Sequence, residues 1–311
     1  MRGLAVAAVV GQGGISVTGA VVRVTSSGLG CPTWPQCFPG SLVPEPNRAV
    51  ATFHQWVEFG NRLITVALVV VAAGCLLAAL ARRPRTGRLV PLAAAMPLGV
   101  VAQAVLGGIT VLTGLAWQTV ALHFLVSMVL VWLAVLLVRE STADALAAPP
   151  GTSRRPVVGP AVRGLAAVTT GVLAVLLAAG TLVTSAGPHA GDAATPRLGA
   201  WSTEQLSMAH AHVLFAFLGL LVGLGFLLHA VAAPRPLVRR FRLLVVVTLS
   251  QGLLGGAQYA LGVPEALVAL HVLGAVLVTA ATAWLWAATT EPAAVGTVVE
   301  REDVVLAAGR P

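Results

Sequence analysis

Residues 103–123 read QAVLGGITVLTGLAWQTVALH, and residues 251–271 read QGLLGGAQYALGVPEALVALH. The two stretches align without a gap at an offset of 148, and they share the first glutamine, a glycine pair, a later glycine and the final VALH. Agreement of this kind is not expected by chance, so we infer an internal repeat. Glycines at fixed places in apolar segments indicate helices that pack closely.

Eight apolar spans contain and surround this repeat, each near the roughly 20 residues that a helix needs to cross a bilayer. They run over about 3–24, 56–80, 89–112, 118–138, 162–184, 206–231, 241–262 and 265–287. The two copies lie four spans apart, as expected for a parallel duplication. The sequence therefore predicts an all-α, polytopic membrane protein, with eight transmembrane helices arranged as two pseudo-repeated four-helix bundles.

The composition agrees with a membrane environment. Charged residues make up only 10% of the 311 residues and hydrophobic residues 57%, whereas soluble proteins carry about 25% charge. A chain this poor in charge cannot cover a soluble surface. Its net charge of +8 resembles that of a nucleic-acid-binding protein, but the arginines sit in short clusters between apolar spans, which excludes that interpretation and indicates membrane topology.

All 19 basic residues are arginines, and most gather in alternate connections. The clusters are Arg82, Arg83, Arg85 and Arg88; Arg139, Arg154, Arg155 and Arg163; and Arg235, Arg239, Arg240 and Arg242. The long connections between them hold only Arg48 and Arg197. The positive-inside rule then predicts a protein of the cell membrane with both termini in the cytoplasm.

The repeat and the charges divide the chain into four expected parts. These are an N-terminal four-helix half over 1–140, a cytoplasmic linker over 141–161, a C-terminal four-helix half over 162–288 and a cytoplasmic tail over 289–311. The linker is predicted from its content of Ala, Pro, Ser and Thr.

Two histidines occupy equivalent places in the repeat. His123 and His271 each lie about six residues inside a span, roughly 9 Å deep at 1.5 Å per residue. His210 lies near the outer end of the sixth span. The plain alternative is a histidine bonded to a neighbouring helix, but ionisable residues within a membrane usually have a function. A matched pair therefore favours metal ligands.

Haem iron suits these histidines better than zinc does. Zinc usually takes three or four protein ligands, and neither cysteines nor carboxylates cluster beside them. Haem iron needs one or two axial ligands, commonly histidine. His212 lies 200° around the helix from His210 and cannot face the same haem. His229 is predicted not to be a ligand, and His189 either contacts a haem propionate or is solvated.

A polar stripe opens the second span, in HQWVEFGNRLIT over 54–65. Its members, on one helical face, are His54, Glu58, Asn61, Arg62 and Thr65. One interpretation is a Glu58–Arg62 ion pair that anchors the helix. The other is the polar wall of a substrate pocket, in which Glu58 is the catalytic group that handles a proton or orients the substrate.

Cys31 and Cys37 lie in the first outer loop, in LGCPTWPQCFPG. On the oxidising side of a bacterial membrane a disulfide is the favoured interpretation. A redox-active or transiently haem-linked thiol pair is the alternative.

These motifs together resemble the haem A synthase family. The resemblance rests on GGISVTGAVVRVTSSGLGCPTWPQC, EFGNRLIT, LGGITVLTGL, VALHF and GPHAGD, with the histidines of the sixth and eighth spans, and it covers about residues 10–285. The cysteine loop with its Trp-Pro is the most specific part. The resemblance implies oxidation of a ring methyl of haem O to a formyl group, giving haem A for terminal oxidases.

The resemblance also implies sites and partners. The iron of a haem b cofactor would be held by His210 and His271 in the C-terminal half. The haem O substrate would bind in the N-terminal half with Glu58 and His123. Molecular oxygen and an unidentified electron donor are the implied co-reactants. Haem O synthase, membrane lipid and a second copy of the chain are further candidate partners.

One position departs from the family. Its second-helix histidine is matched here by Asn61, and the repeat supports that register because Asn61 and His210 lie 149 residues apart. The first-half iron is then expected to be held by His123 alone or with His54, beside Arg62. Our hypothesis is that His123 is the sole strong ligand and that the Asn61 side is open for oxygen.

Other classes of protein share some of these features. A b-type electron-transfer cytochrome needs the histidine pairs but no substrate pocket, and Asn61 opposite His210 argues against two equivalent haems. A membrane transporter also shows repeats but does not need histidines at matched depths. A purely structural assembly factor would tolerate the loss of His210 and His271.

Overall fold

The structure is a computed structural model that describes residues 1–46, 49–83, 87–142, 145, 154–193 and 195–292. It contains eight long helices, which are α1 (Arg2–Val24), α2 (Thr52–Ala81), α3 (Leu89–Leu112), α4 (Trp117–Glu140), α6 (Pro160–Ala186), α7 (Thr203–Ala230), α8 (Arg235–Ala260) and α9 (Glu265–Ala287). All eight are long and apolar enough to cross a membrane. Large apolar side chains such as Phe226 and Leu253 stay exposed on their outer faces. The chain is therefore a multi-pass membrane protein.

Two helices begin earlier than the apolar pattern indicated. Helix α2 starts at Thr52 rather than residue 56, and α8 starts at Arg235 rather than residue 241. The arginines at 235, 239, 240 and 242, predicted to lie in a connection, belong instead to the first turns of α8. Charge ends an apolar pattern without ending a helix, because arginine is a good helix former. Pro236 in the first turn favours the start.

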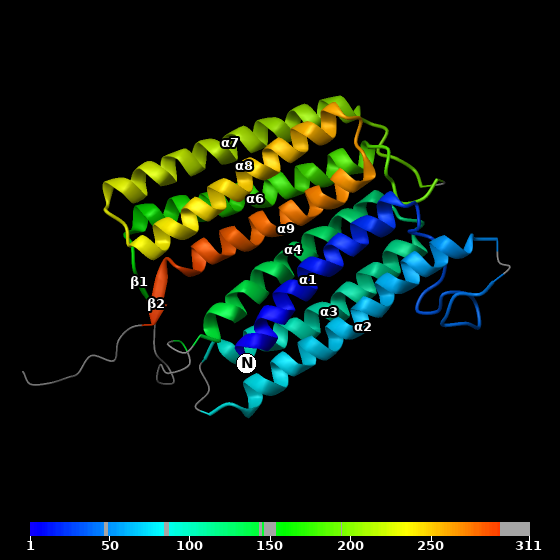
Figure 1. Cartoon of the computed structure of the whole chain (residues 1–311), viewed down its shortest axis with the longest axis horizontal. Helices are drawn as coiled ribbons and strands as arrows, with labels where there is room; N and C mark the ends of the chain where they lie inside the picture. Colours follow the sequence, from blue (N-terminus) through cyan, green and yellow to red (C-terminus); the bar gives the residue numbers. More distant parts are fainter. Residues whose placement is uncertain (47–48, 84–86, 143–144, 146–153, 194, 293–311) are drawn as a thin grey trace, which may run out of the picture.

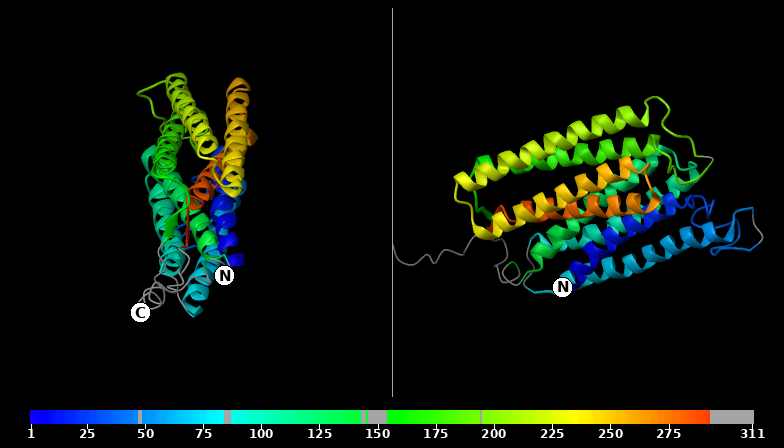
Figure 2. Two further views of the ribbon diagram at one scale, coloured as in Figure 1. Left: turned by 90° about the vertical axis from the view of Figure 1, so that its left-hand side faces the viewer. Right: turned by 45° about the horizontal axis from the view of Figure 1, so that its top comes forward.

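The helices form the two predicted bundles, which lie side by side (Figure 1). In the first half each helix packs against the next, and α4 returns to α1, so the ring is closed. Its core includes Leu68, Met96 and Leu137. In the second half α6 packs with α7 and α8 with α9, while α7–α8 and α6–α9 contacts are sparse (Figure 2). The second half is therefore two helix pairs rather than a closed ring.

The halves meet where α1 and α4 pack against α9. Met128, Val131 and Val276 form a separate buried cluster at this contact. Gly13 of α1 faces Val276 so closely that a Cβ there would lie 2.9 Å from the Val276 Cγ1. A small residue thus allows the two helices to approach, as in other membrane proteins.

The repeated sequence folds into a repeated turn. Gly114 and Leu115 before α4 have φ values of 61° and 60°, and Gly262 and Val263 before α9 have 77° and 62°. In both turns the second residue donates its N–H back to the helix, to Thr110 or Gln258, at 2.8 Å. This six-residue closure is typical of a helix C-terminus. The shared turn starts α4 and α9 in the same way, so His123 and His271 lie at matching depths.

The described residues of the connections 25–51, 113–116, 187–202 and 261–264 lie at one end of the bundles, here called the loop end (at right in Figure 1). At the opposite end β1 (Arg154–Pro156) pairs antiparallel with β2 (Thr290–Pro292). The apolar pattern did not indicate these three-residue strands, which are too short to show a period. Residues 143–144 and 146–153 of the predicted linker and the tail beyond residue 292 lie outside the described residues, as do Arg48 and Arg85.

A buried ion pair joins the strands to the first half. Arg154 Nη1 lies 2.6 Å from Glu140 Oε1 at the end of α4, with both side chains largely buried. Arg154 also donates to the side chain and carbonyl of Thr290. Burial lowers the pKa of the Arg154 guanidinium, and the Glu140 carboxylate opposes that shift. One arginine therefore ties α4 to the strand that follows α9.

Replacing Arg154 with alanine should destabilise the protein by about 3 kcal/mol, because Glu140 would stay buried without its partner. Arg155→Ala is the matched control, since its pair with Glu291 is exposed, and should cost at most ~0.5 kcal/mol. Thermal unfolding of the purified protein in detergent would measure both. Equal losses in the two variants would contradict the assignment.

Candidate functional site

The repeat histidines each lie against bare backbone of the preceding helix. A Cβ at Gly107 of α3 would lie 3.3 Å from the His123 Cε1, and one at Gly255 of α8 would lie 2.9 Å from the His271 Cε1. Each imidazole therefore occupies space that a side chain would fill if Gly107 or Gly255 were any other residue. The two halves use the same device, so it belongs to the duplicated unit.

A glutamine one turn before each glycine holds the histidine-bearing helix. Gln103 Nε2 donates to the His123 carbonyl at 3.0 Å, and Gln251 Nε2 donates to the His271 carbonyl at 2.8 Å. Residues four apart share a helical face, so glutamine and glycine act on the same histidine from one side. Gln103 also donates to Ser127 Oγ. The glutamine fixes the depth of the histidine, and the glycine fixes the surface against which its ring lies.

The histidines divide into two groups by their hydrogen bonds. Three are bonded within the protein: His54 to Ser27 at 2.9 Å, His189 to the Val263 carbonyl at 2.9 Å and His212 to the Met208 carbonyl at 2.7 Å. In contrast, the imidazoles of His123, His210 and His271 have no hydrogen-bonding partner among the described residues. Nδ1 of His123 and of His271 is buried.

Buried polar atoms are nearly always paired in folded proteins. None of the three forms the bond to a neighbouring helix that the plain alternative requires, and in His123 and His271 the unpaired ring nitrogen is buried. Rings that are held by backbone contacts yet left without partners are suited to accept a ligand. The remaining histidine, His229, is exposed and lines a cleft of about 300 Å³ with Phe241 and Arg242 at the end opposite the loops.

His210 and His271 come from different helix pairs of the second half, α7 and α9. His210 Nε2 lies 3.5 Å from where a Cβ on Gly180 of α6 would be. No group of three or more metal-binding side chains occurs in the described part of the chain, which disfavours zinc. Two imidazoles from different helix pairs, neither with a hydrogen-bonding partner among the described residues, fit the axial ligands of a haem iron.

In the first half an amide stands where the second half has His210. Asn61 Oδ1 accepts a hydrogen bond from Thr18 Oγ1 of α1 at 2.7 Å. No described residue accepts a hydrogen bond from its amide nitrogen. The position that corresponds to His210 thus carries an amide held by Thr18 rather than a second imidazole.

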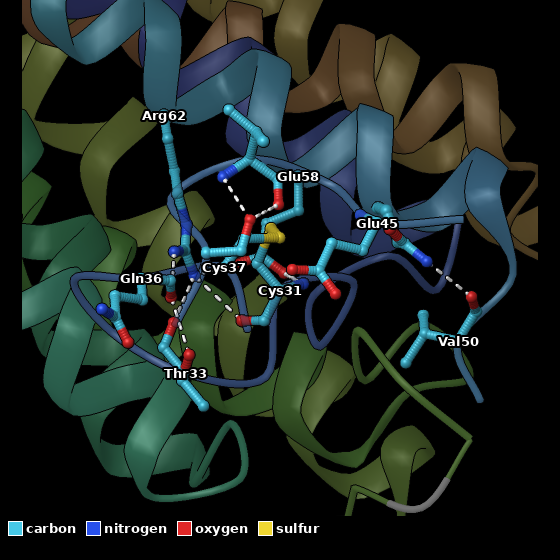
Figure 3. The surroundings of a disulfide bond; sticks show 11 residues. Cys31, Thr33, Gln36, Cys37, Glu45, Val50, Glu58 and Arg62 are labelled. Carbon is cyan, nitrogen blue, oxygen red and sulfur yellow. Dashed lines mark hydrogen bonds and ion pairs between the residues drawn. A yellow bond between two sulfur atoms is a disulfide. The ribbon is translucent and has the colours of Figure 1, made fainter. Parts of the chain in front are cut away.

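Glu58 and Arg62 form the predicted i,i+4 ion pair, at 2.6 Å, and it anchors a loop as well as the helix (Figure 3). Glu58 Oε2 accepts from the Cys31 N–H at 2.7 Å. Arg62 donates to the carbonyls of Cys31, Thr33 and Gln36. The loop is closed by a Cys31–Cys37 disulfide with Cα atoms 4.3 Å apart. The buried Glu58 carboxylate and Arg62 therefore hold the backbone of this loop in place.

The loop in turn places Trp34 against the first bundle. A Cβ at Gly108 would lie 2.5 Å from the Trp34 ring, and the adjacent Gly107 supports His123. Trp34 therefore covers the loop end of the first half, beside the His123 helix hairpin. Sequence reasoning missed Trp34, Thr18 and the two glutamines as site residues, although the glutamines were visible as the first residue of each repeat.

Comparisons with known proteins point to one family. Residues 2–217, more than two thirds of the chain, match the family described as cytochrome oxidase assembly protein. A haem A synthase of Geobacillus thermodenitrificans is 40% identical over 53 residues, which are 17% of this chain and 15% of that protein. A haem A synthase of Lysinibacillus sphaericus is 38% identical over 53 residues, 17% of this chain and 16% of that protein. The aligned part spans about a seventh of these relatives, and the matches confirm the family resemblance read from the motifs.

Gly255→Ala should displace the His271 ring, because the added methyl would lie within 3 Å of Cε1. We expect a several-fold loss of bound haem per polypeptide, measured from the Soret absorbance of the purified protein. Gly107→Ala should have a smaller effect, since the contact there is 3.3 Å. Gly256→Ala is the control: no atom lies within 4 Å, and alanine favours helix over glycine. Full haem occupancy in Gly255→Ala would refute the role of the glycine.

Proposed function

Because the chain belongs to the cytochrome oxidase assembly protein family, we propose that it is a haem A synthase, which oxidises a methyl group of haem O to the formyl group of haem A. The chain aligns with only 15–16% of the length of the haem A synthases named above. The proposal therefore rests mainly on the site.

The observation that carries it is the set of three histidines without hydrogen-bonding partners. His210 and His271 come from different helix pairs and would together hold the iron of a resident haem b. His123 has the same glycine support and the same glutamine as His271, and it would hold the iron of haem O. A bound haem b would supply electrons, received from a donor, for the reaction in the first half.

The asymmetry between the halves supports a substrate site in the first. A carrier with two equivalent haems would need an imidazole at Asn61, as at His210. Instead Thr18 fixes an amide there, which leaves one face of the His123 site without a strong ligand. We assign that face to molecular oxygen. The b-type electron-transfer cytochrome remains the second candidate, and it is the one that this asymmetry disfavours.

Glu58, Arg62 and His54 line the loop end of the proposed haem O site. Glu58 would be the proton-handling group, and its ion pair with Arg62 keeps the disulfide loop and Trp34 over the site. His54 is held by Ser27, so it would contact the substrate edge rather than compete with His123 for iron. The carboxylate thus combines a structural role and a catalytic one.

We further propose that the protein lies in the cell membrane with both termini in the cytoplasm. Arg82, Arg83, Arg88, Arg154 and Arg235 all lie near the end opposite the loops, as the positive-inside rule requires. The disulfide then lies on the oxidising side. Membrane lipid would surround the exposed apolar faces.

The direct test is haem extraction from membranes of a host that makes haem O but not haem A, with and without this protein. We expect a new peak of haem A or of hydroxylated haem O, and its loss in His123→Ala. His212→Ala is the control, because His212 is exposed and bonded within its own helix. Unchanged haem O together with a bound haem b spectrum would favour the electron carrier.

Asn61→His should convert the first-half site into a copy of the second. A second imidazole facing His123 would give bound haem O a low-spin, bis-histidine absorption and EPR spectrum, and should abolish oxidation by occupying the open face. The wild-type site should show the spectrum of a single strong ligand. A wild-type bis-histidine spectrum that is lost in His54→Ala would contradict our assignment of the open face.

A further inference from the structure

Arg23 reaches out of its own half of the protein. It lies in the last turn of α1, and its side chain crosses to the second half. Arg23 Nε donates to the His189 carbonyl at 2.6 Å, and Nη2 donates to the Thr184 carbonyl at 3.1 Å. Thr184 belongs to α6, and His189 lies in the connection from α6 to α7.

The charge of this guanidinium has no counter-ion in the described part of the chain. The ion pairs found there join Glu58 to Arg62, Glu140 to Arg154 and Glu291 to Arg155. Arg23 is partly buried, and two of its five N–H donors meet carbonyl oxygens. A cation removed from water is costly unless it is paired with an anion. The free donors are therefore available to an anionic ligand.

The guanidinium lies just beyond the second-half histidines. Helix α6 carries both reference points, because Gly180 lies beside His210 Nε2 and Thr184 lies beside Arg23. Four residues of helix separate these points by about 6 Å toward the loop end. On the other side His189 Nε2 donates to Val263, immediately before α9 and His271. Arg23 is thus placed beyond the iron position, at the loop end of the site.

We infer that Arg23, a residue of the first half, binds a propionate carboxylate of the haem held by the second half. This inference rests on the proposed function, since it needs a haem between His210 and His271. Haem carries its carboxylates at one edge, and a guanidinium binds a carboxylate through paired N–H groups. The second-half site is therefore completed by the first half.

The repeat shows that this contact is not reciprocated. Residues 24–28 read VTSSG and residues 183–187 read VTSAG, so the position of Arg23 corresponds to Leu182. The second half sends no equivalent arginine to the first-half site. A charged anchor on one side fits a haem that stays bound, and its lack on the other fits a haem that must enter and leave.

The test compares haem b with its dimethyl ester, which has no carboxylates. Both are titrated into apoprotein, and the low-spin bis-histidine spectrum reports the second-half site. Wild type should bind haem b at least tenfold more tightly than the ester, and Arg23→Met should lose most of that preference by binding haem b more weakly. Arg23→Lys should retain part of it. Arg197→Met is the control, because Arg197 is exposed and donates to the Pro188 carbonyl.

Three results would overturn the assignment. Equal binding of acid and ester by wild type would show that no carboxylate is recognised, and this comparison needs no variant to fold. If Arg23→Met kept the preference for haem b over its ester, Arg23 would only cap the C-terminal end of α6. Loss of phosphatidylglycerol retention by Arg23→Met, without a change in the ester preference, would make a lipid phosphate the anion. Failure of wild type to bind either haem would instead reject the proposed function itself.

Discussion

A bilayer offers the backbone no hydrogen bonds, and this constraint governs the whole protein. Each crossing segment must therefore be a helix, and its side-chain hydroxyls return their hydrogen bonds to the helix itself, as Thr169 and Ser185 do. In such a setting a polar group without a partner is conspicuous. His123 and His271 each leave a buried ring nitrogen without a partner at matching places in the repeat, and the His210 ring also has no partner among the described residues. Their lack of bonds is what connects the fold to a ligand.

The duplicated unit consists of a turn, a glutamine, a glycine and a histidine, and both halves keep all four. The shared turn fixes where α4 and α9 begin, the glutamine fixes their depth, and the glycine gives the imidazole a place to lie. The halves differ in what surrounds this unit. Asn61 replaces the partner of the histidine, and Arg23 corresponds to Leu182. The common scaffold therefore sets the position of an iron in each half, while the differing residues decide what that iron meets.

The spans, the repeat, the two bundles and the matched histidines could be predicted, because each leaves a periodic or duplicated trace in the sequence. The predicted start of α8 was wrong, since the apolar pattern begins only after the arginines that form the first turns of the helix. The Thr18–Asn61 bond and the Arg23 contacts join segments 43 and more than 160 residues apart, and no local pattern encodes them. Trp34 was noticed only as part of a motif. Its role depends on the Glu58–Arg62 pair, which holds the loop at the height of Gly108.

The different packing of the halves has a consequence for ligand exchange. The first half is a closed ring whose helices pack on one another around their own core, so its site is formed without any ligand. In the second half the two helix pairs have few close backbone contacts, although apolar side chains of both pairs share one buried core. Each pair supplies one of the two histidines. A haem bound by both histidines would add a further contact between the two pairs. In the proposed function, the resident haem therefore adds to the packing of the second half, whereas haem O binds to a bundle whose four helices already form a closed ring.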